Sequence, residues 1–193
     1  MTEPTSVETR IITAAIECIE KYGIQGATNR KIAREAGVNN AAINYYFRSK
    51  DQLIQRCMQV TLENAFDFKD FERLPGASAR KRCAAIFNEL ITGGVQYPGI
   101  ARAHFYELLN TGRYDSLAVE KLNEFAENLT QDLSARGAGL DMDELRLACA
   151  QMTMTVLMAV LAPRLFQSSF GLDLGDAAAR ERFITRLVKK LLG

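Results

Sequence analysis

Hydrophobic residues recur along this chain at the three- and four-residue spacings of amphipathic α-helices, and the alternating pattern of strands is absent. The first stripe predicts a helix that begins near Ser6, behind a capping box formed by Thr5 and Glu8. Gly23 and Gly26 mark the end of this helix. Its inward positions are Ile12, Ala15, Ile16 and Ile19. The pattern therefore predicts an all-α fold.

The segment from Thr28 to Lys50 predicts two short helices joined by a glycine turn. The first spans Thr28–Ala36, and Gly37 supplies the positive φ that a sharp turn needs. Asn39 can cap the second helix with its side chain. The second helix faces inward with Ile43 and Phe47 and outward with Asn40, Ala41, Asn44 and Tyr45. This is a helix-turn-helix whose small, amide and phenol groups suit a surface that enters a DNA major groove.

This helix-turn-helix resembles the DNA-binding motif of the tetracycline-repressor (TetR) family, over the N-terminal part of the chain only. The resemblance rests on Thr28, Ile32-Ala33, Glu35, Ala36-Gly37-Val38, Tyr45-Tyr46-Phe47, Lys50 and Leu53. Two positions depart from the family's pattern, because Asn44 stands where Tyr is frequent and Tyr46 where His is frequent. A phosphate contact made at position 44 in the family is therefore expected here from Tyr45 or Tyr46.

The resemblance implies a homodimeric repressor that binds a palindromic operator in double-stranded DNA and is released by a small-molecule effector. Thr28, Tyr46 and Lys50 are expected to hold phosphates, while Arg30, Asn40 and Tyr45 meet base edges. The full set of expected DNA contacts is Thr28, Arg30, Asn39, Asn40, Ala41, Asn44, Tyr45, Tyr46 and Lys50.

The predicted organisation is an N-terminal three-helix DNA-binding domain, residues 1–50, followed by a helical effector-binding and dimerisation domain, residues 51–193. A fourth helix, opened by a capping box at Ser49 and Gln52, links the two. The first clear break is Leu74-Pro75-Gly76. Five more helices are expected, for a total of about nine, at roughly 79–97, 100–110, 116–136, 142–167 and 177–192.

The family plan implies an effector pocket among the fifth to eighth helices and a dimer interface on the last two. The expected pocket residues are Phe87, Ile91, His104, Phe105, Leu108, Phe125, Met152 and Val156. The expected interface residues are Leu157, Leu161, Phe183, Leu187 and Leu191. With no cluster of charges among the inward positions, we expect a mostly apolar effector, with His104 as a polar anchor. Ordinary core packing remains the alternative for each pocket residue.

The net charge of the whole chain is only +1, which excludes a generally basic nucleic-acid coat. Between Thr28 and Arg56, however, six basic residues stand against Glu35 and Asp51, a local charge of +4. The excess therefore lies on the predicted DNA-binding segment.

The composition argues against an enzyme or a metal protein. The chain has one histidine, and its four cysteines show no metal-binding spacing, so we read them as core residues in a reducing compartment. We expect no catalytic residues, no metal and no cofactor. The polar N-terminus predicts a cytoplasmic protein, and the apolar stretch from Leu147 to Pro163 is too short for a membrane span. A DNA-binding factor of the same fold without a small-molecule effector, controlled by a protein partner or by abundance, remains open.

Overall fold

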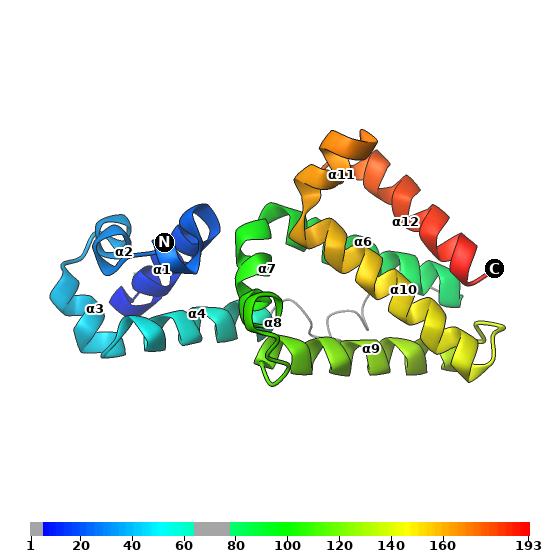
Figure 1. The fold of residues 1–193 in the computed structure, drawn as a ribbon, viewed down its shortest axis with the longest axis horizontal. Helices are drawn as coiled ribbons and strands as arrows, with labels where there is room; N and C mark the ends of the chain where they lie inside the picture. Colours follow the sequence, from blue (N-terminus) through cyan, green and yellow to red (C-terminus); the bar gives the residue numbers. More distant parts are fainter. Residues whose placement is uncertain (1–5, 64–77) are drawn as a thin grey trace. The chain divides into compact units, whose positions relative to one another are not determined.

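The computed structural model describes residues 6–63 and 78–193, and within these ranges every regular element is an α-helix (Figure 1). The all-α prediction is therefore confirmed. The helices of the described residues are α1 (Val7–Gly26), α2 (Asn29–Ala36), α3 (Asn40–Phe47), α4 (Lys50–Glu63), α6 (Ala79–Gln96), α7 (Pro98–His104), α8 (Tyr106–Thr111), α9 (Leu117–Ala135), α10 (Met142–Leu161), α11 (Pro163–Phe170) and α12 (Ala177–Leu191). The predicted break at Leu74-Pro75-Gly76 and the predicted cap at Thr5 lie outside the described residues.

The chain divides into two compact units. Unit 1 comprises Met1–Asn64 together with Gly99–Gly112, and unit 2 comprises Ala65–Pro98 together with Arg113–Gly193. The helix α4, expected to link two domains, thus groups with α1–α3 in unit 1, and the segment containing most of α7 and α8 joins them.

Unit 1 is built on the apolar stripe of α1. Ile11, Ala15 and Ile19 are fully buried and pack in one cluster with apolar residues of α2, α3 and α4. The cap of α1 is Ser6, whose hydroxyl accepts from the amide of Thr9. The predicted end of α1 is visible as a kink at Gly23, where φ is 72°, although helical structure continues to Gly26.

The start of α7 is held against α1 by a carboxylate and a glycine. Glu20 Oε2 accepts a hydrogen bond of 2.9 Å from the amide of Ile100, one of the donors that a helix N-terminus leaves unpaired. Gly99 is buried, and a Cβ there would collide with the carbonyl oxygen of Glu20. The backbones approach too closely for any larger residue at position 99.

Unit 2 packs α6 against α9, α10 and α12, and α10 crosses α6 in Figure 1. At this crossing a Cβ on Gly94 would collide with the side chain of Val160, so glycine sets how closely α10 approaches. Arg82, only 1% exposed, joins α6 to α9 through an ion pair of 3.3 Å with Asp132. A buried charge needs such a partner, because desolvating it alone is costly.

Two predicted helices are each interrupted, which raises the count over the described residues from nine to eleven. The helix expected at 142–167 stops at Leu161, since Pro163 lacks an amide proton and instead occupies the first position of α11. The helix expected at 100–110 stops at His104 and resumes at Tyr106. Phe105 there is buried and has a ψ of 10°, so packing rather than a breaker residue interrupts this helix.

By length and composition alone α10 could cross a membrane, but half of its most apolar window is buried inside the fold. Nine of its residues are buried against other helices, among them Met152 and Val156. A core helix of a globular unit has the same properties, although α10 is longer than the apolar stretch on which the expectation from the sequence rests.

Candidate nucleic-acid interface

The helix α3 presents one apolar and one polar side. Ile43 and Phe47 are buried, four residues apart, and anchor α3 in the core of unit 1. The opposite side is exposed and carries Asn40, Ala41, Asn44, Tyr45 and Tyr46. Tyr45 is 81% exposed, and its ring meets that of Tyr46 edge-on at 5.2 Å between centroids. Large aromatic side chains this exposed are uncommon without a partner, so this side of α3 is a candidate contact surface.

The turn before α3 is fixed by side-chain caps. Thr28 Oγ1 accepts from the amide of Lys31 at 3.4 Å, and Asn39 Oδ1 accepts from the amide of Ala42 at 2.9 Å. Gly37 adopts a φ of 64° between the two helices. The predicted cap at Asn39 and the predicted glycine turn are observed, while Thr28, predicted as the first residue of its helix, is the cap that precedes it. The caps leave Thr28 and Asn39 exposed beside the free amides of two helix N-termini, an arrangement that attracts anions.

The predicted cations differ in their surroundings. Arg30 is exposed on the first turn of α2. Lys50 is half-buried, and its ammonium donates to the carbonyl of Ile24 at 3.1 Å. The ammonium of Lys31 donates to the carbonyl of Gly26 and lies 3.9 Å from the ring centroid of Tyr22. Part of the local positive charge therefore also holds the end of α1 in place.

The predicted pocket residues belong to both units. In unit 2, Phe87, Ile91, Phe125 and Met152 are at most 1% exposed, and the rings of Phe87 and Phe125 meet edge-on at 6.4 Å. Val156 is buried with them. The other expected residues, His104, Phe105 and Leu108, lie on or between α7 and α8 in unit 1.

His104 has a protein partner within unit 1. Its Nε2 lies 3.0 Å from Thr61 Oγ1, and that hydroxyl donates its proton to the carbonyl of Cys57 at 2.9 Å. His104 therefore donates from Nε2, which leaves Nδ1 unprotonated in the neutral ring. Burial lowers the pKa of His104 to about 4, because the charged ring would lose its hydration.

The described part of the chain contains four buried thiols and no metal-binding group of side chains. All four cysteines are free and buried. Burial raises the pKa of the Cys57 thiol to about 12, and burial also raises the pKa of the other three thiols. Across residues 6–63 and 78–193, no three His, Cys, Asp or Glu side chains are grouped to hold a metal.

Sequence reasoning missed two polar side chains that the fold buries. The ion pair of Arg82 had no signal in the sequence, because its partner is fifty positions away on another helix. Thr153 is 4% exposed on α10, and its hydroxyl has no hydrogen-bond partner among the described residues. A buried polar group without a partner is destabilising, and it often marks a functional site.

The fold and the exposed side of α3 together define the class of this protein. It is a helix-turn-helix protein with an additional helical unit. Residues 11–57 match the family model described as "Bacterial regulatory proteins, tetR family". The regulator BetI of Escherichia coli, from several strains, is 35% identical over 79 residues. This match covers 40% of the chain and 40% of BetI, so it spans less than half of either protein.

Solved structures resemble the fold over almost the whole chain. A TetR-like regulator from Rhodococcus sp. RHA1 has a TM-score of 0.68 at 13% identity and covers 98% of this chain and 97% of its own. A TetR regulator from Legionella pneumophila has a TM-score of 0.69 at 16% identity and covers 98% of each chain. FadR from Bacillus subtilis, in complex with stearoyl-CoA, has a TM-score of 0.63 at 20% identity over 93% of this chain and 96% of its own. The N-terminal helices of this chain are thus similar to the DNA-binding segment of TetR-family regulators, and the fold of the whole chain is similar to that of TetR-like structures.

Proposed function

We propose that this chain is a cytoplasmic, homodimeric transcriptional repressor that binds a palindromic operator in double-stranded DNA. The observation that carries the proposal is the exposed side of α3, where two amides and two phenols surround Ala41 while Ile43 and Phe47 fix the helix from behind. Amides read adenine edges, and small or aromatic groups contact thymine methyls, so this set suits a major groove.

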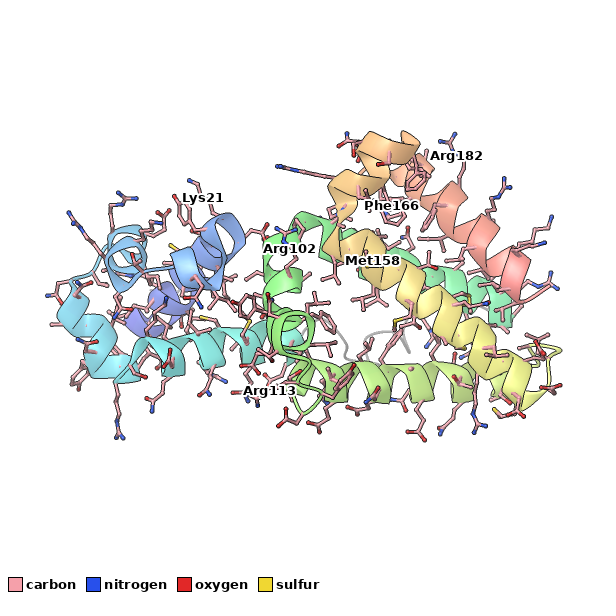
Figure 2. All side chains as sticks on the ribbon, in the orientation of Figure 1. Lys21, Arg102, Arg113, Met158, Phe166 and Arg182 are labelled. Atoms are coloured by element: carbon pink, nitrogen blue, oxygen red, sulfur yellow. The ribbon has the colours of Figure 1, made fainter. Side chains whose placement is uncertain are left out.

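The homodimer is supported by an apolar stripe that unit 2 leaves uncovered. Four apolar side chains there are about half exposed: Leu147 at 58%, Met154 and Leu165 at 48%, and Met158 at 47%. On α10, Leu147, Gln151, Met154 and Met158 follow the alternating four- and three-residue spacing of a packed helix seam, and Leu165 lies on α11 beyond the break at Ala162. Figure 2 shows Met158 on α10. A contiguous stripe of this kind is typical of an interface, here with a second copy of the chain.

The residues proposed for the interface from the sequence are less exposed than this stripe. Leu157, Phe183, Leu187 and Leu191 are half-buried within the chain, and Leu161 is buried at 9%. On α12, Phe183 packs edge-on against Phe166 of α11, with 5.9 Å between the ring centroids. We therefore propose that α10 supplies the centre of the interface and that α12 flanks it.

The effector proposed for this regulator is a mostly apolar small molecule held within unit 2. The residues Phe87, Ile91, Phe125, Met152 and Val156 form an apolar interior, and Thr153 adds one hydroxyl that lacks a partner. An apolar lining with few polar groups is typical of small-molecule sites. FadR of similar fold was solved with stearoyl-CoA, an acyl chain on a polar carrier, which supports this ligand class. Effector binding would favour a dimer form that does not fit the operator.

The alternative is a regulator of the same fold without an effector. It is favoured by the complete burial of Phe87, Ile91, Phe125 and Met152, which fill their part of unit 2 with side chains. A groove of about 320 Å³ does lie between α6 and α12, but it is lined largely by small and polar residues, among them Ala84, Asn88 and Arg180. A thermal-shift assay with a panel of fatty acids and acyl carriers distinguishes a regulator with an effector from one without. A bound effector raises the melting temperature of the protein.

Selection from a random DNA library tests the DNA-binding proposal directly. We expect the protein to enrich a sequence of two inverted half-sites whose centres lie about one helical turn, or a multiple of it, apart. A matched variant, Tyr45→Ala with Asn44→Ala, should bind the enriched sequence no better than random DNA. Recovery of no repeated half-site by the parent protein contradicts the proposal.

A further inference from the structure

Arg48 occupies a strained turn between α3 and α4. Its φ is 59° and its ψ is −39°, and the amide of Ser49 donates to the carbonyl of Phe47 at 2.6 Å across it. A hydrogen bond that spans one residue with positive φ defines the rare and strained form of the γ-turn. Over the described residues, the other seven positions with positive φ are glycines, and Arg48 is the one exception.

The neighbouring helices force this conformation on Arg48. Its amide makes the last bond of α3, to the carbonyl of Asn44 at 2.9 Å, and the carbonyl of Ser49 already accepts the first bond of α4, from Leu53 at 3.2 Å. On either side, Phe47 and Leu53 are buried in the core of unit 1. Only Arg48 and Ser49 are therefore available to turn the chain between two anchored helices. A residue in the left-handed conformation makes such a tight turn most directly.

Glycine would fill this position without strain, so the arginine calls for a reason outside the fold. Its side chain is exposed, and it has no ion pair or hydrogen bond to another described residue. It follows directly on Tyr45, Tyr46 and Phe47 of the exposed helix. Strained non-glycine residues are typical of functional sites, where the position of the side chain offsets the strain.

We propose that the strained turn holds the Arg48 guanidinium as a phosphate clamp beside α3, a DNA contact that the family motif and the predicted contact set do not include. The proposal rests on the proposed DNA-binding function. A guanidinium donates two parallel hydrogen bonds to a phosphate, and a rigid turn reduces the freedom that is lost on binding. The contact positions the protein on the backbone and does not read bases.

Replacement of Arg48 by glycine removes both the backbone strain and the positive charge. The two effects are measured separately, one as stability and the other as DNA binding. We expect Arg48→Gly to raise the melting temperature by about 2–4 °C, because relief of the turn outweighs the freedom gained by the unfolded chain. The same variant should weaken binding to a fluorescent random-sequence duplex about tenfold, and should lower the slope of log K against log salt by about one unit for each bound subunit. Arg48→Lys should keep the slope.

The controls distinguish the failure of this inference from the failure of the proposed function. Lys81→Ala removes an exposed positive charge from the first turn of α6 in unit 2 and should leave affinity and slope unchanged. A parent protein that does not bind the duplex at low salt overturns the DNA-binding function and this inference with it. If the parent binds and Arg48→Gly binds equally well, only the phosphate clamp is wrong. A lower melting temperature for Arg48→Gly shows that the arginine stabilises the end of α3, which also overturns the inference.

Discussion

The ammonium of Lys50 donates a hydrogen bond of 3.1 Å to the carbonyl of Ile24, and so ties the first residue of α4 to the chain just after the kink in α1. Lys50 was expected from the sequence as a phosphate contact. An ammonium has three protons, so one bond to Ile24 leaves two for a phosphate. The carbonyl thereby orients the ammonium in the absence of DNA.

This pairing predicts two effects of Lys50→Met, a change that keeps the apolar stem. The slope of log K against log salt should fall by about one unit for each bound subunit, and affinity should fall for all sequences alike. Stability should also fall, by roughly 1 kcal/mol, because the carbonyl of Ile24 loses a charged donor. Salt titration by fluorescence anisotropy and urea unfolding measure the two effects. An unchanged slope together with lowered stability would make Lys50 purely structural.

Substitutions of Tyr45 and Arg30, which we propose to contact base edges, should weaken DNA binding in a sequence-dependent way, unlike Lys50→Met. Tyr45 is 81% exposed, so Tyr45→Ala should leave the melting temperature unchanged. On the selected operator we expect a loss of roughly 1–3 kcal/mol in binding, with little loss on random DNA. Arg30→Ala should show the same selectivity. Competition between operator and random duplexes gives the ratio directly, and equal losses on both would assign these side chains to phosphates.

The proposed dimer predicts that charge on α10 separates the subunits without unfolding them. Met154 and Met158 are 48% and 47% exposed, so glutamates at both positions are solvated in the free subunit. In a dimer they would be buried without partners, at a cost of several kcal/mol. We expect sedimentation at micromolar concentration to show a dimer for the parent and a folded monomer for Met154→Glu with Met158→Glu.

A control for the dimer is Leu109→Glu, which places one glutamate on a leucine of α8 in unit 1 that is 65% exposed. It should remain a dimer. A parent protein that sediments as a monomer contradicts the proposed assembly, whatever the variants do.

Most helices could be predicted from the sequence because their signals are local. Gly37 and Asn39 act on dihedral angles and amides within a few residues, and both have the roles that the sequence predicts. Pro163 gave an equally local signal, and its helix break follows from a rule that applies to any proline.

The remaining features depend on contacts between distant segments. The break at Phe105 follows from burial of that ring, and nothing in the neighbouring sequence marks it. The left-handed turn at Arg48 is set by two anchored helices, whereas sequence patterns associate such turns with glycine. The partners of Arg82 and His104 lie 50 and 43 positions away. Local patterns therefore located the two helices and the turn between them but could not place these contacts between distant segments.

The buried histidine of unit 1 predicts a loss of stability in acid. The pKa of His104 in the folded protein, about 4, lies below the ordinary histidine pKa of 6.5, so the unfolded chain takes up a proton first as the pH falls. The stabilisation is fully present above about pH 6.5 and is lost as the pH falls towards 4. Between pH 7 and pH 5 we expect the free energy of unfolding to fall by about 2 kcal/mol because of this residue.

His104→Gln keeps a donor for Thr61 and should show a flatter pH dependence of urea unfolding. An identical dependence in both proteins would mean that other groups cause the loss.

The unpaired hydroxyl of Thr153 allows a test of where the proposed effector binds. Thr153→Val keeps the shape of the side chain and removes a buried group that lacks a partner, so the effector-free protein should become more stable by about 1 kcal/mol. If the effector bonds to this hydroxyl, the variant should bind it about tenfold more weakly and still bind the operator normally. Thr155→Val is the matched control, because Thr155 donates to the carbonyl of Gln151 on the same helix. Calorimetry with an effector found by thermal shift measures the affinity. Equal affinity of parent and Thr153→Val would place the ligand elsewhere, and lower stability of the variant would show that the hydroxyl has a partner in solution.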